Sequence, residues 1–154
     1  MKTAYILVGV PAAGKSTWYE SFSDDPPSVY VSTDMFVEQE ANRVGKTYNE
    51  VFKEYMPTAV EMMADLVREA TRLEMEVVWD QTSVSVKSRK RKFQMLPGYR
   101  MVAVVFPTPD SGELARRLAS RPGKSIPEHV VRSMIDNFEM PTLEEGFDEI
   151  RIIG

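Results

Sequence analysis

The chain has 154 residues, of which 43% are hydrophobic and 27% charged, and it has a formal net charge of −4. That length predicts one domain, residues 1–154, large enough for a sheet covered on both faces, and the acidic balance argues against a protein that coats duplex nucleic acid. The absence of cysteine excludes disulfides and thiolate chemistry, which fits an intracellular enzyme, and no apolar run reaches the roughly 20 residues that span a bilayer.

The first predicted elements are a buried strand, a glycine-rich loop and a helix. Residues 4–8 form an unbroken apolar run, which is typical of a strand in a parallel sheet. The next eight residues, Gly9-Val10-Pro11-Ala12-Ala13-Gly14-Lys15-Ser16, match the phosphate-loop pattern G-x-x-x-x-G-K-[ST] without a mismatch. Residues 16–22 can continue as a helix, so the loop has the structural context that the pattern requires.

This loop predicts an ATP site. Gly9 and Gly14 permit backbone geometry in which successive N–H groups point at phosphate oxygens, and the positive end of the helix adds to the attraction. Lys15 is expected to reach the β- and γ-phosphates, and the Ser16 hydroxyl is expected to complete the ligand shell of Mg²⁺. The alternative is a loop that only joins strand to helix, but the combined pattern favours nucleotide binding by Gly9, Ala12, Ala13, Gly14, Lys15, Ser16 and Thr17.

A second strand is predicted at residues 29–31, after a turn at residues 24–28. Asp34 follows this strand and so lies at its carboxyl end, where ligand sites in open α/β sheets gather. The sequence therefore predicts that Asp34 shares a rim with the phosphate loop and has a catalytic role. A helix N-cap is the alternative role for an acid in this position.

The middle of the chain predicts a long amphipathic helix and a third strand. Thr47 to Glu50 has capping-box spacing, Pro57 is expected to kink or restart the helix, and one apolar stripe follows: Val60, Met63, Ala64, Val67 and Ala70. Residues 76–80 are predicted to form a strand that ends in Asp80. An acid at this place commonly handles Mg²⁺ or its water shell, and the alternative is a helix cap or an arginine partner.

A cationic run follows the third strand. Residues 87–92 carry five cations in six positions, which is most often a solvated helix face, and a nuclear-localisation signal is a further interpretation. Its place just after the strand that ends in Asp80 favours a phosphate-facing role, for which we select Arg89.

The last third of the chain predicts a strand at residues 100–106 and two helices around a basic turn. The second helix is expected to start with the capping-box spacing Ser125 to Glu128. The two helices and the turn, at about residues 114–139, predict a mobile lid over the triphosphate, with Arg121 stabilising charge on the transferred phosphoryl group. A closing strand at residues 147–153 completes an α/β fold with a five-stranded parallel sheet, helices on both faces and a small helical lid.

The pattern resembles the kinase domain of 5′-polynucleotide kinases, of both phage and mammalian type, over nearly the whole chain. Besides the phosphate loop, Ser32-Thr33-Asp34 stands where the family has Asn-Arg-Asp, and Asp80-Gln81-Thr82-Ser83 resembles its Asp-Asn-Thr-Asn segment. Ser88-Arg89-Lys90-Arg91 falls where mammalian-type members carry Ser-Arg-x-Arg, and residues 121–127 are similar to the phage-type lid. The most family-specific match is Phe138-Glu139-Met140-Pro141-Thr142-Leu143-Glu144-Glu145-Gly146-Phe147, which closely resembles a mammalian-type segment.

The resemblance implies transfer of the γ-phosphoryl group of ATP, with Mg²⁺, to the 5′-hydroxyl end of single-stranded DNA or RNA. It makes Asp34 the general base and Arg121 the lid arginine. The sequence departs from the family at Thr33 and at residues 37–38, where arginines are missing, so the acceptor is less defined than the ATP chemistry. No Asp-x-Asp-x-Thr phosphatase motif occurs, which predicts kinase activity alone. The alternatives are a kinase of a small metabolite, nucleoside or sugar, and a non-catalytic ATP-binding module.

Overall fold

The computed structural model describes residues 2–22 and 26–154, so residues 24 and 25 of the predicted turn lie outside the described residues. Its strands are β1 (Thr3–Val8), β2 (Ser28–Val31), β3 (Glu76–Asp80), β4 (Arg100–Val105) and β5 (Glu149–Ile152). Its α-helices are α1 (Lys15–Ser21), α2 (Thr33–Val44), α3 (Tyr48–Arg72), α4 (Val86–Met95), α5 (Ser111–Ala119) and α6 (Glu128–Asp136). A short 3₁₀ helix, η1 (Leu143–Glu145), precedes β5.

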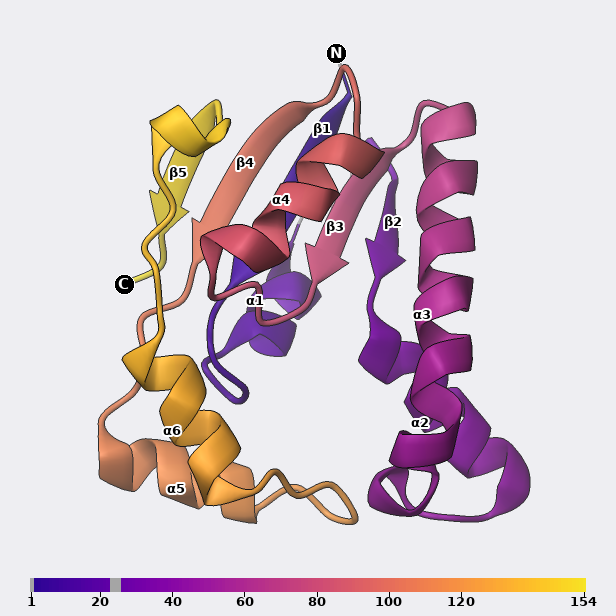
Figure 1. Ribbon diagram of the computed structural model, residues 1–154, viewed down its shortest axis with the longest axis vertical. Coiled ribbons are helices and arrows are strands. Elements are labelled where there is room, and N and C mark those ends of the chain that lie inside the picture. Colours follow the sequence, from indigo (N-terminus) through magenta and orange to yellow (C-terminus); the bar gives the residue numbers. More distant parts are fainter. Residues whose placement is uncertain (1, 23–25) are drawn as a thin grey trace.

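The strands form one parallel sheet in the order β2-β3-β1-β4-β5. This order confirms the predicted α/β fold. Because every strand runs in the same direction, the carboxyl ends share one rim, which is the lower end of the sheet in Figure 1. β1 is the central strand, so the phosphate loop that follows it emerges in the middle of that rim.

Helices cover both faces of the sheet (Figure 1). On one face, Val67 of α3 and Phe93 of α4 pack in the cluster that contains Ile6. On the other face, Trp18 of α1 packs in the cluster that contains Leu7. Successive strand side chains point to opposite faces, and both faces are covered, which explains why β1 is apolar without alternation.

α3 confirms one part of its prediction, excludes one of two alternatives and corrects one position. The capping box predicted at residues 47–50 is present in both directions. The helix then continues through Pro57 instead of restarting, because Val51 before the proline and Ala59 after it are both buried against α2. Val60, which was predicted to lie in the apolar stripe, is 45% exposed, and Ala59 takes the buried position.

α5 and α6 form a helical pair beside the phosphate loop. Leu114 of α5 and Val131 of α6 pack with Val10 of the loop in a small apolar cluster. The predicted cap of α6 is wrong, because the helix begins at Glu128 without a side-chain cap and Ser125 does not serve it. The helical pair therefore packs on the loop itself, beyond the carboxyl ends of the strands (Figure 1).

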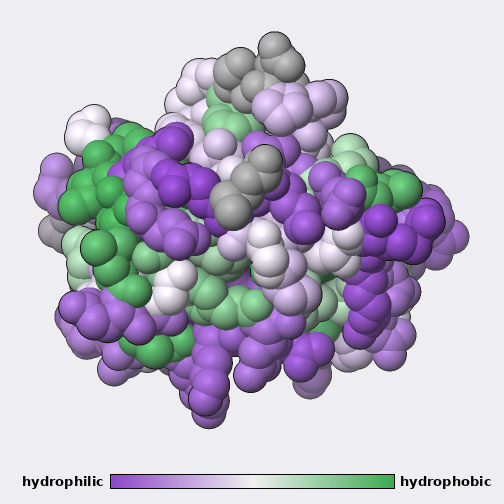
Figure 2. Space-filling view, turned by 90° about the horizontal axis from the view of Figure 1, so that it is seen from above, coloured by the Kyte–Doolittle hydropathy of each residue, from purple (hydrophilic) through white to green (hydrophobic). Residues whose placement is uncertain are grey.

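Across residues 2–22 and 26–154, no helix combines the length and the apolar character that crossing a membrane requires. Figure 2 looks onto the end of the molecule opposite the rim and shows mainly hydrophilic residues, with hydrophobic ones gathered toward one side. Large hydrophobic side chains that are exposed in the structure include Phe52 and Val60, both on α3.

Candidate nucleotide and acceptor site

A cavity of about 1590 Å³ opens at the rim of the sheet. Its lining comes from the phosphate loop, the ends of β2 and β3, the start of α2, the first three turns of α3, and the predicted lid at residues 114–139. The cavity therefore brings together segments that are far apart in the sequence, as expected at the carboxyl ends of parallel strands.

The phosphate loop has the backbone geometry that its glycines predict. Gly9 donates its N–H to the carbonyl of Thr82 at 2.9 Å, and a Cβ on Gly9 would lie 3.0 Å from the Cβ of Phe106. Gly14 has a φ of 107°, which residues with a side chain rarely adopt. Ala12 also has a positive φ, 66°. These conformations leave a concave loop at the start of α1, which suits an anion.

Lys15 lies on this loop with its ammonium group turned back onto it. Its Nζ donates to the carbonyl oxygens of Gly9, at 2.8 Å, and Val10, at 2.9 Å. Burial lowers the pKa of Lys15 to about 8, against the opposing effect of the carboxylates of Asp80 and Asp34. A bound triphosphate would supply negative charge beside the Lys15 ammonium group and so favour its protonated form, which burial disfavours.

Asp80 ends β3 beside Lys15 and is almost fully buried. One of its oxygens accepts a short hydrogen bond from the hydroxyl of Tyr30. Burial raises the pKa of Asp80, while the Tyr30 hydrogen bond and the charge of Lys15 act in the opposite direction. Asp80 thus lies in the cavity at the end of its strand, and its hydrogen-bond partner is a tyrosine hydroxyl instead of an arginine.

Asp34 lies on the other side of the cavity, in the first turn of α2. It is not the N-cap of that helix, because Ser32 has that position and accepts from the N–H of Met35 at 3.4 Å. Both carboxylate oxygens of Asp34 are engaged instead. Oδ1 accepts from the hydroxyl of Tyr48 at 2.6 Å, and Oδ2 accepts from Nζ of Lys124 at 3.1 Å.

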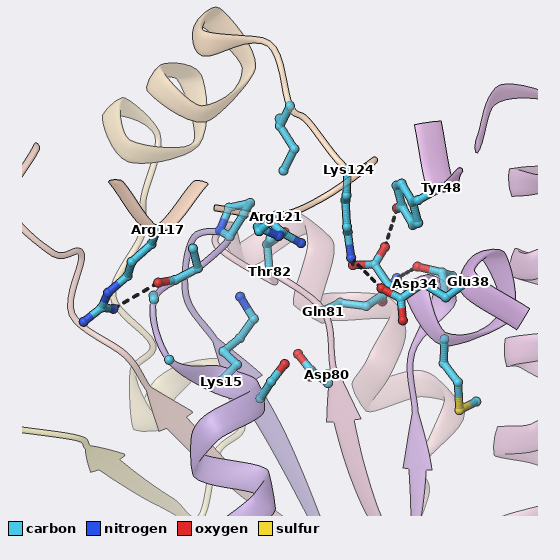
Figure 3. Close-up of a pocket in the computed structure, with 18 of the residues that line it drawn as sticks. Lys15, Asp34, Glu38, Tyr48, Asp80, Gln81, Thr82, Arg117, Arg121 and Lys124 are labelled. Atoms are coloured by element: carbon cyan, nitrogen blue, oxygen red, sulfur yellow. Dashed lines mark hydrogen bonds and ion pairs between the residues drawn. The ribbon is translucent and has the colours of Figure 1, made fainter. Parts of the chain in front are cut away.

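Lys124 comes from the lid and is shared between two acids. Its Nζ also donates to Oε1 of Glu38 at 3.0 Å, and it lies 4.4 Å from the ring centre of Tyr48. Figure 3 shows this group of four residues on one side of the cavity, and Lys15 and Asp80 on the other. Sequence reasoning missed Tyr48 and Lys124, although the first opens a capped helix and the second belongs to the basic turn.

Two lid arginines approach the phosphate loop. Arg117 donates from Nη1 to the carbonyl of Ala12 at 3.0 Å and from Nε to Glu113 at 2.7 Å. Arg121 lines the cavity, and its Nη1 is buried without a hydrogen-bond partner among the described residues. A buried guanidinium nitrogen without a partner is rare in folded proteins, and an anion in the cavity would satisfy it. Both the loop and this arginine therefore fit a phosphate chain.

A divalent cation also fits the site, although few protein side chains could serve as its ligands. Ser16 and Asp80 both line the cavity and are oxygen donors of the type that Mg²⁺ prefers. No cluster of three or more His, Cys, Asp or Glu side chains suited to a metal occurs in the part of the chain that the structure describes. The ion would accordingly depend on phosphate oxygens and waters for most of its ligands.

The lid is tied to the start of α3 by a set of contacts that we call the lid latch, residues 47–49 with 123–125. The side chain of Asn49 accepts from the N–H of Ser125 at 3.0 Å and donates to its hydroxyl at 2.7 Å. The N–H of Asn49 donates to the carbonyl of Gly123 at 3.0 Å. Gly123 has a φ of 67°, and a Cβ there would lie 2.9 Å from the Cβ of Thr47. Ser125 is engaged here, which explains why it does not cap α6.

Arg89 departs from its prediction. Its side chain is fully buried, and its Nε donates to Oε1 of Glu145 at 2.6 Å while Nη1 donates to the carbonyl of Ser83 at 2.8 Å. It does not line the cavity. The phosphate-facing role is thus replaced by a buried ion pair that joins α4 to η1, because Arg89 and Lys92 lie on the inner side of α4.

Comparison with known proteins gives a family and a fold. The family model described as an AAA domain matches residues 5–141. A bifunctional polynucleotide phosphatase/kinase of Schizosaccharomyces pombe (strain 972 / ATCC 24843) is 29% identical over 150 residues, which cover 94% of this chain and 32% of that protein. The chain thus spans about a third of the length of that relative.

Two of the solved structures that are similar to the chain show the range of the likeness. The structure of the Pnkp1/Rnl/Hen1 RNA repair complex contains a chain that is 23% identical, with a TM-score of 0.69, and the match covers 88% of this chain and 43% of that one. A gluconokinase from Sinorhizobium meliloti 1021 is 16% identical, with a TM-score of 0.55, and the match covers 98% and 81% of the two chains. At these identities the likeness concerns the fold alone.

Proposed function

Because the chain belongs to the AAA-domain family and has the fold of a P-loop kinase, we propose that it transfers the γ-phosphoryl group of ATP to the 5′-hydroxyl end of single-stranded DNA or RNA. The observation that carries the proposal is the place of Asp34, which lines the same cavity as the phosphate loop but on its opposite side. An alcohol between them would meet a carboxylate on one side and a phosphate chain on the other.

We assign the phosphate side of the cavity to the loop residues Gly9, Ala12, Ala13, Gly14, Lys15, Ser16 and Thr17. Lys15 and Arg121 offset negative charge on the transferred group, which is the main contribution that a protein makes to phosphoryl transfer. Ser16 and Asp80 are the residues that would hold Mg²⁺ or its water shell, and the ion, when bound, supplies further charge neutralisation on the phosphate oxygens.

We assign the acceptor side to Asp34. Its carboxylate accepts the proton of the attacking hydroxyl and aims the oxygen for in-line attack. Tyr48 fixes one carboxylate oxygen through its 2.6 Å hydrogen bond, which leaves the other oxygen to be exchanged between Lys124 and the incoming hydroxyl. The relatives named for polynucleotide phosphatase/kinase activity and for RNA repair support a nucleic acid end as the acceptor.

A 5′-end-labelling assay with a single-stranded oligonucleotide tests this assignment. Asp34→Asn should lower the transfer rate on the order of 10²–10⁴-fold, because the amide cannot accept the proton. Glu38→Gln is the matched control, since Glu38 lies one helical turn away and shares Lys124 but is not the proposed base. Full transfer by the Asp34→Asn variant, or an equal loss in both variants, would show that the base role is wrong.

A small alcohol is the second candidate acceptor, and one observation favours it. Glu38 places a second carboxylate beside Asp34, where the next backbone phosphate of a polynucleotide would be repelled unless Lys124 stays with it. A panel of sugars, nucleosides and oligonucleotides with matched ATP concentrations separates the candidates. Transfer to a sugar or small metabolite with no transfer to any oligonucleotide would replace the polynucleotide proposal.

A further inference from the structure

An exposed aromatic side chain lines the acceptor side of the cavity. Phe52 of α3 is 41% exposed, although it faces the cavity. Its ring lies 5.5 Å from the ring of Tyr48, one helical turn earlier, at an interplanar angle of 37°. Met56, one turn later, also lines the cavity, so one face of α3 presents a continuous apolar wall.

Packing within the protein explains Tyr48 and Met56, which also contact the buried cluster between α2 and α3, but it does not explain Phe52, which belongs to none of the apolar clusters that the described residues form. Val51 and Ala59 on the same helix are buried against α2, which shows where the core contacts of α3 lie. A single exposed phenylalanine on a convex surface would need no explanation, but one that lines a concave site offers a contact for a ligand. Aromatic rings are the side chains on which flat ligands stack.

The position of Tyr48 relates the wall to the chemistry. The hydroxyl of Tyr48 contacts Asp34, while its ring contacts Phe52. Phe52 is therefore separated from Asp34, the proposed general base, by about one aromatic ring. In a nucleoside, the sugar ring and its C5′ carbon separate the 5′ oxygen from the nucleobase. Lys124 lies over the ring of Tyr48, which leaves Phe52 as the more accessible of the two rings.

We infer that Phe52, supported by Tyr48, is the surface on which the nucleobase of the acceptor stacks. The acceptor is then a nucleoside-type alcohol, with a flat base on the same sugar that carries the reacting hydroxyl. This inference rests on the proposed function and deepens it. A neutral base is suited to the place, because it meets no repulsion from Asp34 or Glu38, unlike a phosphate group.

The test measures kcat and KM for three acceptors: an oligonucleotide with a normal 5′-terminal base, the same oligonucleotide with an abasic 5′-terminal sugar, and a free nucleoside. Phe52→Ala should raise the KM of the two base-bearing acceptors by roughly 5- to 150-fold, the loss typical of one stacked base. The KM for ATP and the activity on the abasic end should stay unchanged. Phe52→Trp should retain the low KM, since it keeps a ring.

Val60→Ala is the matched control, because Val60 is an exposed apolar residue of the same helix that does not line the cavity. Equal losses on base-bearing and abasic acceptors, or no change in Phe52→Ala, would overturn the stacking role while leaving the kinase proposal intact. A wild-type protein that transfers phosphate to none of the three acceptors would overturn the proposed function as well. A response limited to the oligonucleotide or to the free nucleoside identifies which source of the base the site uses.

Discussion

Lys15 has a pKa of about 8 because it is partly buried beneath its own loop. In the free protein it loses its proton just above neutral pH, whereas bound phosphate would hold that proton in place. We therefore expect the affinity for ATP to fall by up to tenfold per pH unit above about pH 8. Calorimetric Kd values at several pH values measure this, with Lys15→Arg as the comparison, because arginine stays charged and should flatten the profile. A flat wild-type profile contradicts the expectation.

Lys92 is a second lysine with a lowered pKa. Burial is the main cause, and it lowers the pKa to about 8. Its Nζ donates to the carbonyl of Ser88 at 3.2 Å, and it lies 5.2 Å from the ring centre of Trp79. The folded state resists protonation of this group, so stability should be lowest below about pH 8 and should rise toward the ordinary lysine pKa of about 10.4.

Lys92→Met should accordingly raise the free energy of unfolding at neutral pH by about 1–3 kcal/mol and remove the rise at alkaline pH. Urea unfolding at two pH values measures both effects. Lys90→Met, an exposed lysine on the same helix, controls for the lost charge. A Lys92→Met variant that is less stable than the wild type would show that the contacts of the ammonium group outweigh its burial.

At the level of single residues, the sequence predicted the groups whose position follows from strand ends. Asp80 ends a strand of the parallel sheet, Lys15 and Asp34 come after two others, and all three line the cavity. Arg89 was misplaced, because a run of cations does not reveal which of its members faces inward on a helix. Tyr48 could not be found, because its contact with Asp34 depends on how α3 crosses α2, which no local pattern records.

At the level of elements, loss of the lid latch should affect the opening of residues 121–127 more than the stability of the whole protein. Asn49→Ala removes the side-chain bonds to Ser125 but leaves the backbone bond to Gly123. Each lost bond is worth about 0.5–1.5 kcal/mol, so the lid turn should open about tenfold or more often, with little change in global stability because the site is exposed.

Hydrogen exchange of residues 121–127 measures this opening. Asn137→Ala is the control, since the Asn137 side chain donates to the carbonyl and hydroxyl oxygens of Ser133 within α6. Unchanged exchange in the Asn49→Ala variant would show that the ion pairs of Lys124 hold the lid without the latch.

Helix boundaries followed the local sequence signals where no contact with a distant part of the chain competed with those signals. The capping box of α3 formed as predicted, whereas the one predicted for α6 did not, because Asn49 engages Ser125 from another part of the chain. Of the two outcomes predicted for Pro57, the helix does not restart there, because tertiary burial of α3 on both sides of the proline outweighs the local cost.

At the scale of the whole molecule, the sheet separates two apolar layers, each with one tryptophan. Trp79 belongs to the layer under α3 and α4, and Trp18 packs with the layer under α1. We propose that residues 1–154 form one domain, so both layers should unfold together.

Single-tryptophan variants test this. In Trp18→Phe and in Trp79→Phe, the fluorescence of the remaining tryptophan should give the same urea midpoint as the far-ultraviolet circular dichroism of the same variant. Each variant is its own control, because any change in stability shifts both signals alike. A fluorescence midpoint that departs from the dichroism midpoint in either variant would divide the chain into separately unfolding parts.

The ion pair between Lys124 and Asp34 bears on a side reaction, the hydrolysis of ATP by water in place of transfer to an acceptor. Under the proposed mechanism, in which Asp34 is the general base, Lys124 holds a carboxylate oxygen that could otherwise activate water, and it would thereby slow the hydrolysis of ATP. Lys124→Ala should then release inorganic phosphate from ATP faster when no acceptor is added. An unchanged rate of release would mean that Lys124 does not suppress this hydrolysis.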